Sequence, residues 1–192
     1  VNNVSETIRM VLQKCQEWHL SACMGGIDVA SAFDHLEFHA ADKGFEFRGT
    51  PRRIRVLLAD SLRNIRVKLH AFDCVSDPVF STRGGRQGHT DTPCQWNSSL
   101  CKPLSILLDD LKLRKFGIFL DNVHLALFVW ADNIYILANN LVELHIMLEE
   151  VSKILWHDLR VTIKPSDAHW MGNEWCCEPG SRVDVCLPPV CL

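Results

Sequence analysis

The chain lacks the long apolar runs and biased segments that mark membrane and fibrous proteins. No apolar run reaches the roughly 18 residues of a membrane-spanning helix, and the sequence holds no repeat or low-complexity tract. No secretory signal accompanies the nine cysteines. They match no paired zinc spacing, even at Cys176, Cys177, Cys186 and Cys191. We therefore expect an intracellular protein, in cytoplasm or nucleus, with reduced cysteines, no disulfide framework and no membrane contact.

The chain also lacks the overall positive charge of many nucleic-acid-binding proteins. Its net charge is −3, and its 47% hydrophobic content over 192 residues is typical of a globular protein with a sizeable core. Residues 48–68, here called the basic segment, differ from the rest of the chain. They include seven basic residues and a single acid, Asp60. Such a segment is typical of phosphate contact, although a solvated helix face has the same pattern. The basic residues are Arg48, Arg52, Arg53, Arg55, Arg63, Arg66 and Lys68.

The spacing of apolar residues predicts an alternating order of helices and strands. Helices are expected at 5–19, 35–43, 52–63, 93–113 and 140–157. Strands are expected at 24–29, 66–72, 79–82, 117–120, 123–130, 134–138, 159–163 and 168–171. Gly44 is expected to end the second helix, and Thr92 or Asp91 to cap the fourth. The last two strands are expected to pair with each other, and 79–82 is the expected partner of 66–72.

Three short motifs stand out within this pattern. Residues 24–34, MGGIDVASAFD, place Asp28 at the end of a buried strand. Residues 128–133, FVWADN, place Asp132 at the tip of a hairpin. Between them, residues 83–93, RGGRQGHTDTP, form a loop rich in glycine that also contains glutamine. This order matters because polymerases that transfer phosphoryl groups hold two metal ions with carboxylates from separate strands.

From about Thr7 to about Met171 the chain resembles the palm region of the reverse transcriptases of non-LTR retrotransposons. The resemblance implies an α/β (α+β) polymerase palm with an antiparallel sheet core and helices packed on one face. It implies an RNA-directed DNA polymerase that uses two Mg²⁺ or Mn²⁺ ions, an RNA template, a DNA primer and deoxynucleoside triphosphates. We expect this palm-like domain over 1–172, without the family's upstream fingers or its thumb, and a loose tail over 173–192.

The resemblance also implies roles for individual residues. Asp28 and Asp132 would bind the metals, and Phe33, five positions after Asp28, would crowd the 2′ position of the sugar. Gly88 would allow the backbone close to the incoming nucleotide, and Gln87 would offer amide donors and an acceptor near the template–nucleotide pair. Outside the family pattern, a turn aspartate and a core aromatic are the ordinary readings of the first motif. The second motif matches the family at Arg86, Gln87, Gly88, Thr92, Pro93, Trp96 and Asn97.

Two positions depart from the family pattern. Asn133 replaces the second of two hairpin carboxylates, keeping an acceptor oxygen but losing a charge. Because Mg²⁺ is commonly held by one or two carboxylates plus substrate phosphates, Asp28 and Asp132 can suffice. The alternative is a catalytically dead remnant that only binds nucleic acid. Lys164 is the nearest counterpart of the family's lysine beside the leaving pyrophosphate, and its alternative is an ordinary surface lysine.

A third possibility is an unrelated metal-dependent α/β hydrolase. It would need histidines to converge on Asp28 and Asp132, and no recognised spacing joins the candidates to each other. These candidates are His35, His89 and His124.

Overall fold

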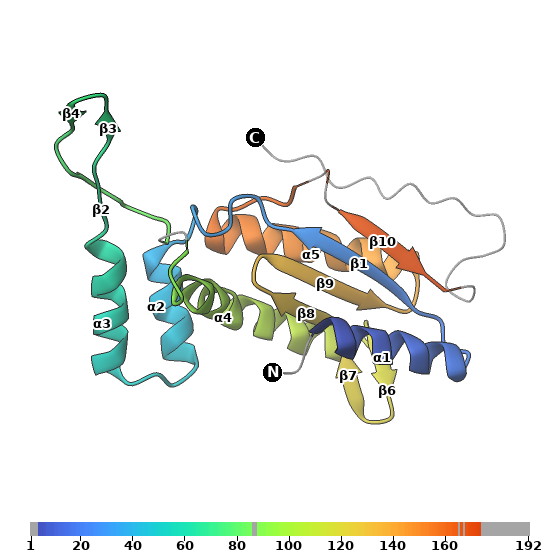
Figure 1. The fold of residues 1–192 in the computed structure, drawn as a ribbon. Helices are drawn as coiled ribbons and strands as arrows, with labels where there is room; N and C mark the ends of the chain where they lie inside the picture. Colours follow the sequence, from blue (N-terminus) through green and yellow to red (C-terminus); the bar gives the residue numbers. More distant parts are fainter. Residues whose placement is uncertain (1–3, 86–87, 165, 167, 174–192) are drawn as a thin grey trace. The chain divides into compact units, whose positions relative to one another are not determined.

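The structure is a computed structural model that describes residues 4–85, 88–164, 166 and 168–173 (Figure 1). The described residues contain five helices and ten strands. None of these helices is long and apolar enough to cross a bilayer. The chain divides into two compact units. Unit 1 consists of Val1–Ala30, Leu104–His157 and Val161–Leu192, and unit 2 of Ser31–Pro103 and Asp158–Arg160.

An antiparallel sheet of four strands forms the centre of unit 1. Its strands, in spatial order, are β10 (His169–Gly172), β1 (Cys23–Asp28), β9 (Asn133–Ala138) and β8 (Leu127–Trp130). Buried and half-buried residues alternate along β1, because successive side chains of a strand point to opposite faces. The sheet and its helices confirm the predicted mixed α/β class with an antiparallel core.

Helix α5 (Leu141–Leu159) covers one face of this sheet, behind β1 and β9 in Figure 1. Gly25 in β1 permits a close approach, since a Cβ there would lie 3.1 Å from Leu144 Cδ1. Asn140 caps the helix, because its side-chain oxygen accepts a hydrogen bond from Glu143 N at 2.9 Å. The buried apolar stripe of α5 comprises Leu144, Met147, Leu148, Val151 and Leu155.

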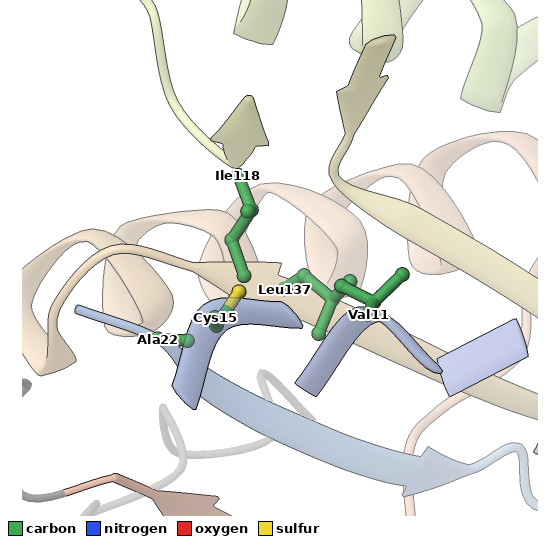
Figure 2. Close-up of a cluster of buried hydrophobic side chains, with 5 residues drawn as sticks. All are labelled: Val11, Cys15, Ala22, Ile118 and Leu137. Atoms are coloured by element: carbon green, nitrogen blue, oxygen red, sulfur yellow. The ribbon is translucent and has the colours of Figure 1, made fainter. Parts of the chain in front are cut away.

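Helix α1 (Val4–Glu17) packs against the opposite face. Leu137 follows Ile136, the partner of Gly25, and therefore points away from α5. It joins a buried cluster with residues of α1 and of the hairpin formed by β6 (Ile118–Leu120) and β7 (Val123–Leu125), as Figure 2 shows. The buried members are Val11, Cys15, Ala22, Ile118 and Leu137. Helices thus lie on both faces rather than on the single expected face, because α1 also has an apolar stripe to bury.

Unit 2 contains three helical segments. They are α2 (Phe38–Phe47), α3 (Arg52–Arg63) and the first part of α4 (Thr92–Leu113), whose later part belongs to unit 1. The prediction that Gly44 ends a helix over 35–43 was wrong. Gly44 lies inside α2 and is buried, and a Cβ there would lie 1.7 Å from the carbonyl oxygen of Ser98. The glycine is needed for the close approach of α2 to α4 and not for a turn.

Residues 65–81, here called the arm, extend from the end of α3. The arm holds two short antiparallel pairs, β2 (Arg66–Val67) with β5 (Val79–Phe80) and β3 (His70–Ala71) with β4 (Cys74–Val75). The expected pairing of 66–72 with 79–82 is therefore confirmed only at its base, and the single long strand is broken. The reason is exposure, because a strand without a covered face gains little from apolar alternation. Its exposed apolar residues are Val67, Leu69, Phe72, Val75, Val79 and Phe80.

Two further strand predictions were wrong. The strand expected over 123–130 is divided at Ala126 into β7 and β8, which pair with different partners. The final strand, β10, pairs with β1 and not with 159–163, where only Ile163 forms an isolated bridge to Val29. Helix α5 continues to Leu159 and takes up the start of that segment. The open edge of β1 is then satisfied by β10.

Candidate functional site

Asp28, at the end of the central strand, lies beside the tip of the β8–β9 hairpin. It pairs in register with Asn133, and the next residue, Val29, donates a backbone hydrogen bond to Asp132 O at 3.1 Å. The hairpin turns through a two-residue link in which Ala131 has a φ of 53°, a value that L-residues seldom adopt. Backbone pairing therefore brings the first and third sequence motifs together at one end of the sheet.

Lys164 approaches Asp28 from the other edge of β1. Its backbone N–H donates to Asp28 O at 3.0 Å, and Ala30 N donates to Thr162 O at 2.8 Å. The Lys164 ammonium forms an ion pair with Asp28 Oδ2, in which the Asp28 side chain is 19% exposed and that of Lys164 40%. The second carboxylate oxygen, Oδ1, is buried and has no hydrogen-bond partner among the described residues. One oxygen of Asp28 is thus neutralised and the other is unsatisfied.

No local pattern in the sequence indicates this ion pair. Lys164 was predicted as a residue beside the leaving pyrophosphate or as a surface lysine, and Asp28 as a metal ligand. The two lie 136 positions apart, so no local pattern connects them. Only the bridge between Val29 and Ile163, which arises from long-range pairing, brings them side by side.

The hairpin tip supplies two further oxygen-bearing side chains. Asp132 and Asn133 are half-buried, and Asn133 Nδ2 donates to Asp132 Oδ1 at 3.4 Å. An aspartate at position 133 would replace this attraction by repulsion between adjacent charges. We will call Asp28, Asp132 and Asn133 the sheet end.

The oxygen donors of the sheet end fit a hard divalent cation such as Mg²⁺. Mg²⁺ takes oxygen ligands and is often held by only one or two protein carboxylates. The unsatisfied Oδ1 of Asp28 is one such ligand without a competing hydrogen bond. Across the described part of the chain, no group of three or more His, Cys, Asp or Glu side chains is arranged to hold a metal. A site here therefore depends on two carboxylates, with the remaining ligands coming from water or substrate.

The histidines that a hydrolase would need are held by other groups. Each of the three makes a short contact within its own neighbourhood. The contacts are His35 Nδ1 to Ser31 O at 3.1 Å, His89 Nδ1 to Asp91 Oδ1 at 2.7 Å, and His124 Nε2 to Phe116 O at 2.6 Å. Each contact uses one ring nitrogen only, so the deciding observation is that no three or more His, Cys, Asp or Glu of the described residues are grouped to hold a metal, which gives the hydrolase alternative no support.

Unit 2 brings Phe33 beside the glycine-rich loop. Gly85 N donates to Phe33 O at 2.7 Å, and Gly84 N donates to Leu36 O at 2.9 Å. Gly84 has a φ of 89°, and a Cβ there would lie 2.7 Å from the carbonyl oxygen of Asp34. Gly88 has a φ of 79°, and a Cβ there would meet nothing within 4 Å. The structure therefore describes two of the predicted nucleotide-binding residues, Phe33 and Gly88. The other two in this loop, Arg86 and Gln87, lie outside the described residues.

Most of the basic segment is exposed, with one exception. The Arg55 side chain is only 18% exposed and binds Glu46 at 2.6 Å and Asp42 at 2.9 Å. Hydrogen bonds to Glu46 and then to Asp42 raise the pKa of the Arg55 guanidinium. Its charge is therefore already matched inside the protein. The exposed members are Arg48, Arg52, Arg53, Arg63, Arg66 and Lys68, with Arg66 also 5.2 Å from the Phe80 ring centroid.

Comparison with known proteins rests on structure alone. No family model matches the chain, and no curated protein matches it. Among solved structures, it is similar to apo telomerase from Candida tropicalis, truncated from the C-terminal domain, with a TM-score of 0.65 and 11% sequence identity. The match covers 91% of this chain and 36% of that one, so the chain spans about a third of its neighbour's length. At this identity the likeness shows the fold alone, and the chain has the fold of part of that telomerase.

Proposed function

We propose that the chain is the palm of an RNA-directed DNA polymerase of the kind found in non-LTR retrotransposons. The observation that carries the proposal is the pairing of Asp28 with the hairpin tip at Asp132 and Asn133. The shared fold with part of a telomerase, a reverse-transcriptase-related enzyme, supports it. The matching order of the three motifs supports the finer assignment to retrotransposon enzymes.

In this proposal the sheet end would hold the metals, and the residues that the family resemblance assigns to the nucleotide are Phe33, Arg86, Gln87 and Gly88. Asp28 and Asp132 would hold two Mg²⁺ or Mn²⁺ ions, and the amide oxygen of Asn133 stands where the family has a further carboxylate. Metal ions bound there would supply activation of the primer 3′-hydroxyl and stabilisation of charge on the α-phosphate and the leaving pyrophosphate. Phe33 restricts the sugar 2′ position, and Arg86, Gln87 and Gly88 line the incoming nucleotide. The basic segment holds the phosphates of the RNA template and DNA primer.

Primer extension on an RNA template with Mg²⁺ or Mn²⁺ tests this proposal. Asp28→Asn removes a metal-binding charge without changing size, and we expect it to lower the extension rate at least about a thousandfold, about 4 kcal/mol of barrier. Asp121→Asn is the matched control and should extend as the parent does. Asp121 is an exposed turn aspartate of unit 1 with a φ of 53°, which asparagine tolerates.

Two results contradict the assignment. Equal extension by the parent and by Asp28→Asn would remove Asp28 from the site. A parent chain that stays silent, even when fused to the fingers region of a related polymerase, would remove the polymerase activity itself.

Binding without catalysis is the second candidate function, and one observation favours it. Asn133 and the ion pair of Lys164 with Asp28 both reduce the negative charge that would hold metal ions. Such a remnant would bind an RNA–DNA hybrid in a salt-sensitive way and show no extension with either ion. Extension that appears only after Asn133→Asp would indicate that the site is built correctly but lacks charge.

A further inference from the structure

We propose that Lys164 is a built-in cation that occupies Asp28 and keeps a divalent ion out until a substrate with several phosphates draws the lysine away. The inference rests on the proposed function in one respect, since it takes Asp28 as a ligand of the divalent ion. Its subject is different, because it concerns the order in which ion and substrate arrive.

The contact that carries the proposal is fixed by the backbone. The Lys164 N–H to Asp28 O hydrogen bond and the bridge between Val29 and Ile163 hold the start of the lysine side chain beside the strand end. The ammonium group then meets Asp28 Oδ2 directly. Because backbone pairing holds residue 164 beside Asp28, the ion pair follows from the pairing of the two segments.

Burial makes this ion pair stronger than one at the open surface. The Asp28 side chain is only 19% exposed, so water screens its charge poorly. The Lys164 side chain is 40% exposed and retains a route to solvent. The lysine is therefore close enough to compete for the carboxylate and accessible enough to leave it.

The charge balance explains why a substrate would trigger the exchange. Among the described residues, Asp28, Asp132 and Lys164 together carry a formal charge of −1, so the lysine cancels half of the carboxylate charge that divalent ions would use. A polyphosphate adds several negative charges and offers the ammonium charge-assisted hydrogen bonds of its own. Because Asp28 Oδ1 is unsatisfied while Oδ2 binds the lysine, the resting carboxylate is incompletely paired and open to exchange. Metal binding is then coupled to the arrival of the substrate.

The test measures Mn²⁺ binding to the whole chain without nucleotide, by the loss of the free Mn²⁺ signal in electron paramagnetic resonance. Lys164→Met removes the charge and keeps the length of the side chain, and we expect Mn²⁺ to bind about ten- to a hundredfold more tightly. Lys164→Arg keeps the charge and should bind as the parent does. Lys153→Met is the matched control, because Lys153 is an exposed lysine of unit 1 that pairs with Glu149.

A double variant assigns the gain to the site. Asp28→Asn combined with Lys164→Met should return Mn²⁺ affinity to the parent level. The proposal is overturned if Lys164→Met binds Mn²⁺ no more tightly than the parent, or if the gain survives in the double variant. Lys164→Gln repeats the measurement if the methionine variant does not fold, as checked by its thermal transition.

The outcome is separate from that of the proposed function. Primer extension by a parent whose Mn²⁺ affinity does not change on Lys164→Met would sink the lysine proposal and leave the polymerase. A silent parent with a clear gain on Lys164→Met would keep the lysine proposal and remove the catalytic one.

Discussion

The sheet end of unit 1 and the basic segment of unit 2 hold their charged groups in opposite ways. Asp28 is largely buried, is fixed by backbone pairing on both sides, and meets its partner Lys164 at a defined atom. Arg52, Arg53 and Arg63 project from α3 into solvent. A charge that must act on a reacting atom needs fixed geometry, whereas a charge that attracts a polyanion needs only exposure. A precisely positioned charge and a set of freely exposed charges are thus supplied by different parts of the chain.

The largest expected effect tests how closely the helices of unit 2 pack, by comparing glycine-to-alanine substitutions in the two units. Gly44→Ala places a Cβ 1.7 Å from a backbone oxygen of Ser98, so the two helices must separate. We expect the free energy of unfolding to fall by at least about 3 kcal/mol in urea denaturation. Gly25→Ala in unit 1 meets only the end of the Leu144 side chain at 3.1 Å and should cost about 1 kcal/mol. Similar losses in the two variants would show that α2 and α4 are not held closely.

The second prediction concerns a buried carboxylate in unit 1 that has a structural role. Glu143 accepts hydrogen bonds from Gly117 N, from Asn139 N at 3.4 Å and from Asn139 Nδ2 at 3.1 Å. Glu143→Ala leaves the N–H groups of Gly117 and Asn139 unpaired, although Asn139 Nδ2 still donates to Gly117 O at 2.8 Å, and we expect a loss of about 2–3 kcal/mol in thermal or urea unfolding. Glu149→Ala, on the exposed side of the same helix, should change stability by less than about 0.5 kcal/mol. Equal effects would mean that Glu143 is solvated in solution.

The third prediction separates exposed arginines from the matched one. Changing Arg52, Arg53 and Arg63 together to glutamine should reduce the salt dependence of RNA–DNA hybrid binding by about two to three ions, as measured by fluorescence anisotropy. Arg55→Gln should leave that slope unchanged and lower the thermal midpoint, because its partners are Glu46 and Asp42. A slope that falls only in the Arg55 variant would reverse the assignment.

The smallest effect concerns thiols. Burial raises the pKa of the Cys15 thiol above its ordinary value of 9.0, whereas Cys74 and Cys94 are exposed. Iodoacetamide should therefore label Cys74 and Cys94 before Cys15. A raised pKa in the folded state favours the protonated thiol. The stability that the protonated Cys15 thiol contributes is thus complete below pH 9 and is lost as the pH rises through the folded-state pKa of this thiol. Cys15→Ser should flatten this alkaline decline, and an unchanged decline would contradict the assignment.

The local sequence pattern predicted the bounds of α3 and α4 well, but it predicted the pairing of strands poorly. The helix over 52–63 agrees with α3, and 93–113 agrees with α4 within one residue, because an apolar stripe and a starting proline are both local signals. Neither the division at Ala126 nor the pairing of β10 with β1 has a local signal. Both depend on which edges remain open after the rest of the sheet has formed.

The candidate site divides in the same way. The positions of Asp28 at a strand end and Asp132 at a hairpin tip were predictable, since each directly follows an apolar run. Their roles, and those of Phe33 and Gly88, stay predictions. The contact of Lys164 with Asp28 was not predictable, because it depends on the segment after α5 crossing the end of β1.

The position of β1 between β9 and β10 has a consequence for synthesis. The strand CMGGID leaves the ribosome well before its second neighbour, which ends at Gly172. At about 5–20 residues per second, roughly 7–30 s separate the two. Both edges of the nascent strand are open to foreign partners until β9 has emerged, and the edge that β10 covers stays open through the whole interval. The paired glycines and the terminal acid, which serve helix packing and the sheet end once folded, also make this segment a poor seed for aggregation while it waits.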